Sequence, residues 1–525
     1  MTLLLIFQSA IKAGTCSKRT KHAVASDLVR MSRRPFSSYE RFHDGNIPKR
    51  QCPFRLIYIA LSVGCLVGLA TLLCFSIIEK INSEEQFSRT EDFGSNTAAV
   101  LNEQKEKYEQ SRVELVESIP LDIDYGPNAT FGTPLYNAWK NLLSMATKQV
   151  EVASFYWTLT GEDILVNSST DAPGRDILQA FKDLPSRNVS VRVVASVTCV
   201  AKNSTDLEEL EENGVHVRKV NFKRLTNGVL HSKFWVIDRR HIYIGSANMD
   251  WRSLTQVKEL GVVIYNCSRL AHDLIKIFNS YWMMSHRNAS IPEPWPVTFD
   301  TLFNHEHPLL VNLSGIPSSI YISTSPPSFC PESRSRDLDT ILSVIEEAEH
   351  FIYVSVMDYF PTTQFTLPPR YWPPIDDALR EAAFNRRVVV RLLVGCGRNT
   401  SPAMLPFLQS LDALRYPRRH ISVEVRAFIV PVGNHSGISY TRVNHNKYMV
   451  TDKVAYIGTS NWSEEYFHTT AGVGLVISQE AQNQSSSADS IQQQLRVAFL
   501  RDWDSPFAVP LNELHKNPDC RMSKG

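Results

Sequence analysis

Residues 229–238 read VLHSKFWVID, which places His231 and Lys233 two positions apart inside an otherwise apolar run. A second stretch, RVNHNKYMVTD, begins at position 442 and repeats the pattern with His445 and Lys447. Side chains at positions i and i+2 of a strand point to the same face. We therefore expect two buried strands, each projecting one imidazole and one ammonium together.

Each stretch is followed by a turn and a second apolar run. Asp238 and Asp452 open the turns, and we expect them to stabilise these turns or hold neighbouring cations rather than take part in the chemistry. The first turn is one residue longer, and the runs end in GSAN and GTSN. If both pairs of runs close as hairpins, the glycine of each tetrapeptide lies opposite the motif lysine and leaves a space beside its ammonium. Asn248 and Asn461 are then expected to offer amide donors into that space.

The chain repeats itself once, in order, from about residue 113. VEVASFYW is matched by IYVSVMDY, VSVRVVAS is matched by VVVRLLVG, and each half ends on a helical pattern that finishes at Trp282 or Trp503. Val- and Ile-rich runs that alternate with helical segments indicate strands covered by helices. We predict an α/β fold of two similar halves, each a mixed β-sheet flanked by helices, with one composite active site between them.

Residues 56–78 form an uncharged stretch of 23 residues, longer than the ~20 needed to cross a bilayer. Basic residues precede it, so the positive-inside rule places the N-terminus in the cytosol. A buried core helix or a cleaved signal peptide fits this stretch less well. The predicted parts are a cytosolic basic tail 1–55, a type II transmembrane helix 56–78, a luminal stalk 79–111, a first half 112–290, a linker 291–335, a second half 336–510 and a C-terminal tail 511–525.

The net charge of +1 hides an uneven distribution. Residues 1–78 hold 11 Lys and Arg against 3 Asp and Glu, which leaves 44 against 51 for the rest. An acidic body argues against wrapping a long duplex, but it permits a short groove that takes the end of a single strand. An acidic lumen weakens the repulsion by protonating carboxylates and histidines.

Sequons and cysteines support a luminal body. All N-x-S/T sequons follow residue 78, and we expect glycans at Asn128, Asn167, Asn188, Asn203, Asn266, Asn288, Asn312, Asn399 and Asn434. Asn461 is both a sequon and a pocket candidate, and we expect it to carry no glycan. Five of the nine cysteines follow the transmembrane stretch, enough for at most two disulfides. A disulfide between Cys396 and Cys520 is one candidate, but the sequence does not determine which cysteines pair.

Two halves that face one another would bring two imidazoles, two ammoniums, and amide and hydroxyl donors into one pocket. A phosphate suits such a donor set. Metal binding is the rival interpretation, but each lysine repels a cation and no carboxylate- or Cys-rich cluster completes a ligand set. We expect no metal and no cofactor. One neutral histidine would attack phosphorus to form a phosphohistidine, while the other, protonated, would donate to the leaving oxygen and then activate water.

The pattern HxKxxxxD followed by GSxN, present twice, resembles the phospholipase D superfamily. Flanking words such as GSANMDWRSLTQVKELG, together with the type II anchor, are similar to its luminal branch, sometimes called the third, fourth and fifth mammalian phospholipases D. The resemblance implies catalytic and phosphate-binding roles for His231, Lys233, Asp238, Ser246 and Asn248, and for His445, Lys447, Asp452, Ser460 and Asn461.

The resemblance also implies an activity and a setting. It implies a homodimeric 5′→3′ exonuclease on single-stranded DNA and RNA in the endoplasmic reticulum, Golgi and endolysosomes, with a soluble lysosomal form possible. Two alternatives stay open: an enzyme of the same mechanism that acts on phospholipids, and a catalytically idle glycoprotein, which two intact motifs disfavour.

In the superfamily a Glu or Gln after GSxN often binds the catalytic histidine. Glu259 stands there in the first half, whereas the second half has Gly472. A carboxylate that raises the basicity of its imidazole favours His231 as nucleophile and His445 as acid. The same contact would stabilise an imidazolium, so the reverse assignment stays open.

Aromatic residues cluster near the motifs. We expect one or two of them to stack on unpaired bases and the others to belong to the core. The candidates are Tyr156, Trp157, Trp251, Tyr359, Phe360, Tyr466 and Phe467.

Overall fold

The computed structural model describes residues 110–197, 204–480 and 490–524. The predicted cytosolic tail, the transmembrane stretch 56–78 and nearly all of the stalk lie outside these residues, as does Asn203. Within the described ranges, no helix combines the length and the apolar character needed to cross a membrane.

The first half contains an eight-stranded mixed sheet in the order β2-β1-β10-β8-β7-β3-β5-β6. Its strands are β1 (Arg112–Ser118), β2 (Thr133–Pro134), β3 (Gln149–Ser154), β5 (Ser190–Ser196), β6 (His216–Val220), β7 (Phe234–Ile237), β8 (His241–Gly245) and β10 (Glu259–Tyr265), and β4 (Trp157–Thr158) pairs with β9 (Met249–Asp250). Its helices are α2 (Leu135–Met145), α3 (Ala172–Asp183), α4 (Thr205–Glu212), α5 (Phe222–Leu225), α6 (Trp251–Thr255) and α7 (Ser268–Met284).

The second half contains a nine-stranded mixed sheet in the order β11-β12-β18-β17-β16-β13-β14-β15-β19. Its strands are β11 (Leu309–Leu313), β12 (Ile316–Ser325), β13 (Phe351–Val356), β14 (Val389–Cys396), β15 (Val423–Ile429), β16 (Lys447–Thr451), β17 (Val454–Gly458), β18 (Gly472–Gln479) and β19 (Ala508–Pro510). Its helices are α8 (Asp337–Glu347), α9 (Pro374–Asn385), α10 (Leu405–Asp412), α11 (Glu464–His468) and α13 (Ile491–Trp503).

The predicted repeat is confirmed strand by strand. The run β10-β8-β7-β3-β5-β6 of the first sheet matches the run β18-β17-β16-β13-β14-β15 of the second. One boundary needs correction, because β11 and β12 place residues 309–325, which we assigned to the linker, inside the second sheet. Proline- and serine-rich composition obscured these strands, which pair antiparallel and lie at one end of the sheet.

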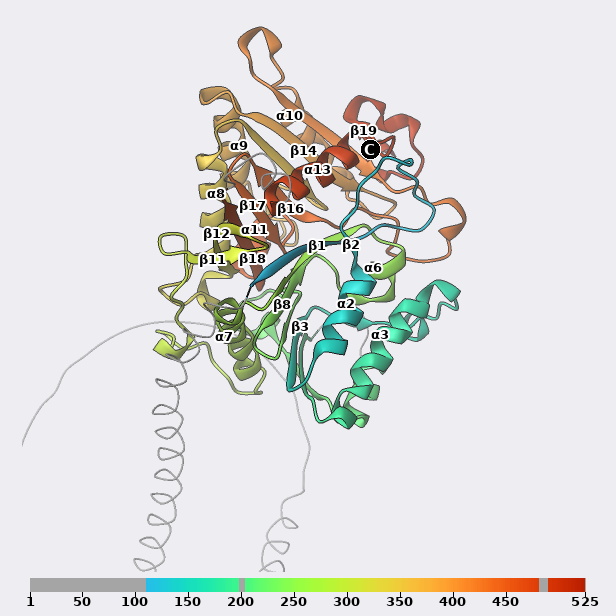
Figure 1. The fold of residues 1–525 in the computed structure, drawn as a ribbon. Coiled ribbons are helices and arrows are strands. Elements are labelled where there is room, and N and C mark those ends of the chain that lie inside the picture. The colour runs from blue at the N-terminus through green and yellow to red at the C-terminus, as the bar shows by residue number, and fades with distance from the viewer. Residues whose placement is uncertain (1–109, 198–203, 481–489, 525) are drawn as a thin grey trace, which may run out of the picture. The chain divides into compact units, whose positions relative to one another are not determined.

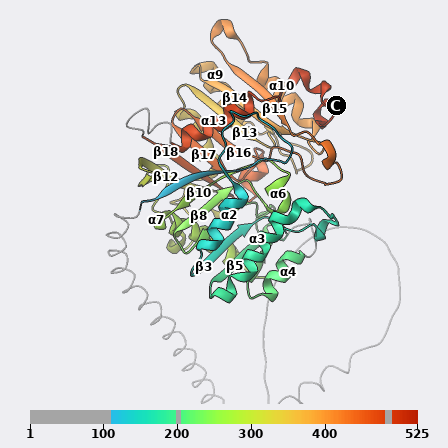
Figure 2. The ribbon, with the colours of Figure 1, turned by 45° about the vertical axis from the view of Figure 1, so that its right-hand side comes forward.

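Helices and sheets alternate in layers, as Figures 1 and 2 show. Residues of α7 and α13 form one hydrophobic core with side chains from both sheets, for example Phe234 of the first sheet and Ile322 of the second. Separate outer cores join α2, α3 and α4 to the first sheet, and α8, α9 and α10 to the second. The strands are therefore covered on both faces, which explains their nearly continuous apolar runs.

The motif hairpins form as the sequence predicts. The turn between β7 and β8 has three residues and the turn between β16 and β17 has two. The amide of Gly245 donates to the carbonyl of Lys233 at 3.3 Å, so the glycine does lie opposite the motif lysine. The prediction that each glycine leaves a space beside the ammonium is wrong, however. A Cβ on Gly245 would meet the Tyr243 hydroxyl at 2.6 Å, and a Cβ on Gly458 would meet the Tyr456 hydroxyl at the same distance.

Candidate active site

Reciprocal backbone pairing holds the two motif histidines between the halves. The amide of His231 donates to the carbonyl of Ala471 at 2.9 Å, and the amide of His445 donates to the carbonyl of Lys258 at 2.8 Å. Each histidine therefore lies beside the residue that precedes the β10 or β18 strand of the opposite half. The histidines themselves come just before β7 and β16 rather than within them.

A buried ion-pair network reinforces this pairing. The side chain of Lys258 is fully buried, and its ammonium lies 2.8 Å from the carboxylate of Asp502 in α13. Asp502 also pairs with Arg501, whose guanidinium binds Glu117 of β1 at 2.6 Å. Charges from both halves thus neutralise one another next to the site.

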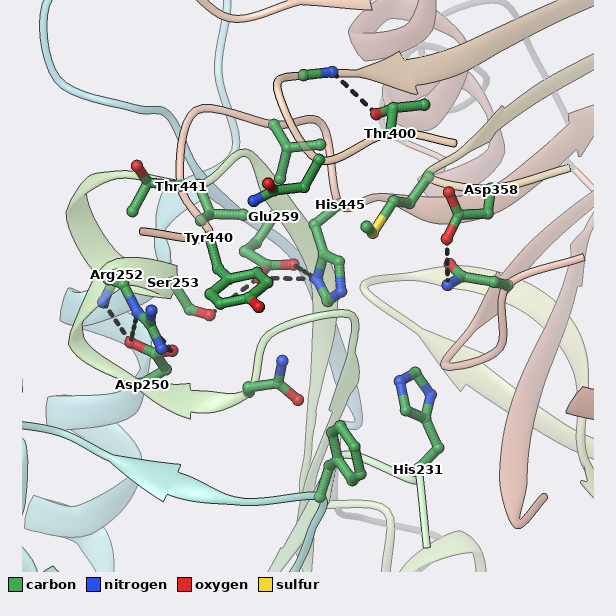
Figure 3. A pocket seen from close by; sticks show the side chains of 18 of the residues that line it. His231, Asp250, Arg252, Ser253, Glu259, Asp358, Thr400, Tyr440, Thr441 and His445 are labelled. Atoms are coloured by element: carbon green, nitrogen blue, oxygen red, sulfur yellow. Dashed lines mark hydrogen bonds and ion pairs between the residues drawn. The ribbon is translucent and has the colours of Figure 1, made fainter. Parts of the chain in front are cut away.

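Both histidines line one pocket of about 580 Å³ that draws side chains from both halves. Figure 3 shows His231 and His445 projecting into it from different segments, with the Glu259 carboxylate beside the His445 ring. Burial is nearly complete, since His231 is 5% exposed and the side chain of His445 is 12% exposed. The structure therefore brings together the two imidazoles that the sequence places 214 positions apart.

The ring of His231 has a backbone partner. Its Nδ1 lies 2.9 Å from the carbonyl oxygen of Thr459 in the second half. Because a carbonyl only accepts, Nδ1 carries the proton and Nε2 keeps a free lone pair. Burial, followed by the charges of Lys233 and Lys447, holds the pKa of His231 well below its usual value. His231 is therefore a neutral imidazole, the form in which a histidine is a nucleophile.

The ring of His445 has a carboxylate partner. Its Nδ1 lies 2.8 and 3.0 Å from the two carboxylate oxygens of Glu259. This corrects our expectation that Glu259 holds the histidine of its own half, His231. The cause is the reciprocal pairing, because Lys258 lies beside Asn444 and so places the next residue, Glu259, at His445.

The Glu259–His445 pair has its own electrostatics. Burial alone would raise the pKa of Glu259, but His445 and Lys447 outweigh it and lower that pKa. Burial lowers the pKa of His445, and Glu259 opposes this change without cancelling it. Of the two histidines, His445 is consequently the easier to protonate.

The motif lysines lie under the histidines. The ammonium of Lys233 donates to the carbonyl of His231 at 2.7 Å, and that of Lys447 donates to the carbonyl of His445 at 2.8 Å. Burial lowers the pKa of Lys447 to about 8 and that of Lys233 well below its usual value. Both ammoniums are buried and add positive potential to the site.

The motif asparagines line the pocket as predicted. The amide of Asn248 donates to the Tyr156 hydroxyl at 3.3 Å, and that of Asn461 donates to Asp358 and to the Tyr466 hydroxyl, each at 3.1 Å. The NH₂ of Asn248 has a second N–H that remains available to a ligand, whereas both N–H groups of Asn461 already have acceptors. Their phosphate-binding role stays a prediction.

The two serines do not share a role, which corrects our pairing of them. The Ser246 hydroxyl donates to Glu259 at 2.5 Å and accepts from the amide of Leu260. Its structural counterpart is Thr459, which makes the matching contact with Val473. Ser460 has no hydrogen-bond partner among the described residues. Neither serine lines the pocket, so Ser246 orients Glu259 rather than a phosphate.

Asp238 and Asp452 also lie outside the pocket, which favours the expected turn-stabilising role over the catalytic role that the resemblance implies. Asp238 accepts the backbone amides of residues 147–149, and Asp452 accepts those of residues 349–351. Each carboxylate therefore fixes the turn that leads into β3 or β13, the neighbour of its own hairpin.

Most of the aromatic candidates are core residues. Five of the seven are buried and do not line the pocket: Trp157, Trp251, Tyr359, Phe360 and Phe467. Tyr156 and Tyr466 do line it, and the Tyr466 ring lies edge-on to the His231 ring at 5.1 Å.

Sequence reasoning missed several pocket residues. The Phe155 ring is tilted against the His231 ring, with their centroids 5.1 Å apart. A buried ion pair between Arg252 and Asp250, at 2.7 Å, lines the first-half wall. Asp358 lines the second-half wall, and burial raises its pKa although Lys447 opposes this. Phe155 lies within VEVASFYW and Asp358 lies within IYVSVMDY, two segments that the repeat aligns, so their positions just after β3 and β13 were a usable signal.

The disulfide between Cys396 and Cys520 forms, and it ties the C-terminal tail to the end of β14. Asn461 is 3% exposed and hydrogen-bonded, which leaves no room for a glycan there. Asn266 is half-buried and accepts from Arg240, whereas the remaining described sequon asparagines are exposed: Asn128, Asn167, Asn188, Asn288, Asn312, Asn399 and Asn434. Their glycosylation stays a prediction.

Among the described residues, one group of three side chains has metal-ligand spacing, formed by Glu349, His350 and Asp452. It is largely exposed, and none of its members lines the pocket. Two imidazoles line the pocket, and the ammoniums of Lys233 and Lys447 lie next to it, bound to the histidine carbonyls and outside the lining. This donor set fits an anion better than a cation.

Comparisons with known proteins agree with this geometry. A family model described as "PLD3/4, PLD-like domain" matches residues 126–433. A human protein named 5′-3′ exonuclease PLD4 is 54% identical over 418 residues, which cover 80% of this chain and 82% of that protein. A human protein named 5′-3′ exonuclease PLD3 is 46% identical over 407 residues, covering 77% and 82%. Among solved structures, a phosphatidylserine synthase from Haemophilus influenzae Rd KW20 matches at 12% identity with a TM-score of 0.49, covering 72% of this chain and 86% of that one.

Proposed function

This chain belongs to the PLD3/4 family of PLD-like proteins, as its two motifs predict, and we propose that it is a phosphodiesterase that trims single-stranded DNA and RNA from the 5′ end. One observation carries the proposal. Two buried imidazoles from opposite halves, each with a lysine beneath it, line one pocket together. Relatives that are 54% and 46% identical are named 5′-3′ exonucleases, which supports the substrate class.

The proposed reaction uses the two histidines in sequence. Nε2 of neutral His231 attacks phosphorus, and the bond from phosphorus to the leaving oxygen breaks as His445 gives that oxygen its proton. A phosphohistidine on His231 results. Neutral His445 then takes a proton from water, whose oxygen attacks phosphorus and frees His231. Lys233, Lys447 and the two motif asparagines stabilise the charge on the phosphoryl oxygens.

The assignment of roles keeps our first expectation but changes its reason. His231 is the nucleophile because burial and two lysines keep it neutral. His445 is the acid because Glu259 stabilises its imidazolium. No step needs a metal, since the ammoniums supply the positive charge that metal ions supply in many phosphoryl-transfer sites.

A test separates the candidate activities. We would incubate the purified protein at about pH 5 with EDTA, offering 5′- or 3′-labelled single-stranded oligonucleotides beside labelled phospholipid. Sequential release of nucleotides from the 5′ end supports the proposal. Turnover of phospholipid alone would establish the lipase alternative, and inactivity toward both would point to an idle glycoprotein. Loss of activity in EDTA that Mg²⁺ or Zn²⁺ restores would refute metal independence.

We further propose that residues 56–78 anchor the chain as a type II protein of the endoplasmic reticulum, Golgi and endolysosome, with a luminal body. A disulfide at Cys396–Cys520 and exposed sequon asparagines support this placement, because disulfides persist in oxidising compartments. Protease protection of tagged termini in microsomes, combined with endoglycosidase digestion, tests it. A protected N-terminal tag would overturn the orientation. The homodimer stays a prediction.

A further inference from the structure

Two aromatic side chains that line the pocket are largely exposed to solvent. Phe365 is 65% exposed and Tyr440 is 75% exposed, whereas Tyr466 is 8% exposed. Both belong to loops of the second half, Phe365 before α9 and Tyr440 before β16. Large rings that line a pocket and face water present apolar area that a ligand can cover.

Phe365 lies along an aromatic wall that leads away from the catalytic centre. The Tyr466 ring is edge-on to His231 at 5.1 Å, and the Phe365 ring is edge-on to Tyr466 at 6.0 Å. The ring of Phe365 is thus two ring contacts from the proposed nucleophile. A group attached to a phosphate at His231 would pass this wall.

The loop that carries Phe365 is fixed by a buried carboxylate. Glu465 accepts the backbone amides of Gln364, Phe365 and Thr366 at 2.8, 2.9 and 3.0 Å. Burial alone would raise the pKa of Glu465, but the amides of Gln364 and Phe365 outweigh it and lower that pKa. A ring on a fixed loop loses little conformational entropy when a ligand packs on it.

Tyr440 lies on a loop that is tied to the first half. The guanidinium of Arg252 donates to the carbonyl of Ser439 at 2.9 Å, next to Tyr440. Figure 3 shows the Tyr440 ring on the Arg252 and Glu259 side of the pocket. Phe365, by contrast, is on the His231 side through Tyr466, so the two rings approach the centre from different walls.

We propose that Phe365 and Tyr440 form a stacking subsite for unpaired nucleobases next to the scissile phosphodiester. The inference rests on the proposed function and adds residues that recognise the substrate. Aromatic rings stack on any base, so the subsite selects for unpaired bases rather than for sequence. A duplex end would leave its bases stacked on one another and out of reach. The acyl chain of a phospholipid is the other apolar occupant, and it needs apolar area rather than a ring face.

A cycle of protein variants and substrates tests the subsite. We would measure kcat/KM for wild type, Phe365→Ala, Phe365→Leu, Tyr440→Ala and Tyr440→Phe on intact oligonucleotides. A second set of oligonucleotides would carry a single abasic position at the first, second or third nucleotide. Leu367→Ala is the matched control, because Leu367 is 86% exposed on the same loop and does not line the pocket.

We expect Phe365→Ala and Tyr440→Ala each to lose about 5- to 150-fold in kcat/KM on intact oligonucleotides, since stacking is worth ~1–3 kcal/mol per base. On the oligonucleotide whose abasic position removes the stacked base, the variant and wild type should have the same kcat/KM. Leu367→Ala should stay near wild type. Tyr440→Phe keeps the ring and should restore most of the kcat/KM that Tyr440→Ala loses, whereas Phe365→Leu should lose nearly as much as Phe365→Ala.

The contrary outcomes are distinct. If wild type degrades oligonucleotides but abasic positions cost nothing, or if the variants lose equally on intact and abasic substrates, the stacking subsite is wrong while the nuclease stands. If wild type releases no nucleotide, both proposals fall. If phospholipid alone is turned over and Phe365→Leu keeps full activity, the rings serve an acyl chain.

Discussion

In the first half, Lys258 pairs with Asn444, and the next residue, Glu259, binds the ring of His445. In the second half, Ala471 pairs with Leu230, and the next residue is Gly472, so His231 binds the carbonyl of Thr459 instead. The backbone arrangement is the same on both sides of the pseudo-repeat. The two motifs differ in one neighbouring side chain, the carboxylate of Glu259, which has no counterpart at Gly472. His231 is therefore neutral, whereas His445 is easier to protonate.

In the second half, a side chain at position 472 would fit only if the neighbouring serine hydroxyls moved. A Cβ on Gly472 would collide with the Ser460 hydroxyl and approach that of Ser325 to 2.9 Å. The asymmetry is consequently built into the packing around Gly472 and does not depend on this one residue alone. In the proposed mechanism, the different surroundings of one histidine give a duplicated fold an acid and a nucleophile.

The largest effects are expected at the histidines themselves. His231→Ala and His445→Ala should each lose at least ~10²- to 10⁴-fold in kcat on oligonucleotides, the range of general acid–base catalysis. His445→Ala should recover rate on a p-nitrophenyl phosphodiester, whose leaving group needs no proton, whereas His231→Ala should not. When the reaction of His445→Ala is stopped without acid, mass spectrometry should find the phosphoryl group on His231. Recovery by His231→Ala instead would reverse the assignment.

Glu259→Gln should have the next largest effect, about 10- to 100-fold in kcat, because it removes the partner that orients a functional histidine. His445 must be protonated to act, and its pKa already lies below its usual value. The amide removes the charge that raises this pKa, so the alkaline limb of the kcat profile should move to lower pH. An unmoved limb, measured from pH 4 to 8, would show that Glu259 does not control His445.

A smaller effect is expected for Ser246→Ala, which removes one hydrogen bond to Glu259. We predict a 3- to 10-fold loss in kcat, which corresponds to ~0.6–1.4 kcal/mol. Ser460→Ala is the matched variant of the other half, and it should stay within about twofold of wild type because its hydroxyl contacts no pocket ligand. Equal losses in the two steady-state measurements would contradict the division between these serines.

The smallest effect on activity is expected for Asp238→Asn and Asp452→Asn, which should leave kcat unchanged and lower Tm at neutral pH. Asp238 accepts hydrogen bonds from the Thr147 hydroxyl and backbone amides, and Asp452 accepts them from backbone amides. Burial alone would raise the pKa of both carboxylates, but these hydrogen bonds outweigh it and lower each pKa below the usual value of 3.8. Their stabilisation is fully present above that value and is lost as pH falls through the lower folded-state pKa. Thermal melts at pH 7 and pH 5 should therefore show the same loss. A fall in kcat with unchanged Tm would restore a catalytic role.

The sequence alone determined the two-fold repeat, the hairpins with their unequal turns, and the meeting of His231 with His445. Local patterns carry this information, because strand periodicity sets which side chains share a face and a repeated motif implies a repeated surface. The sequence also indicated the family, because each family motif lies within one short stretch of the chain.

Only the tertiary structure decided which histidine Glu259 binds and that Ser246 orients Glu259. It also decided which aromatic rings reach the pocket: Trp157 and Trp251 are core, whereas Phe365 and Tyr440 are exposed at the site. The reason is physical, since these contacts join residues from opposite halves or from loops. They depend on how the two sheets pack and not on any periodicity along the chain.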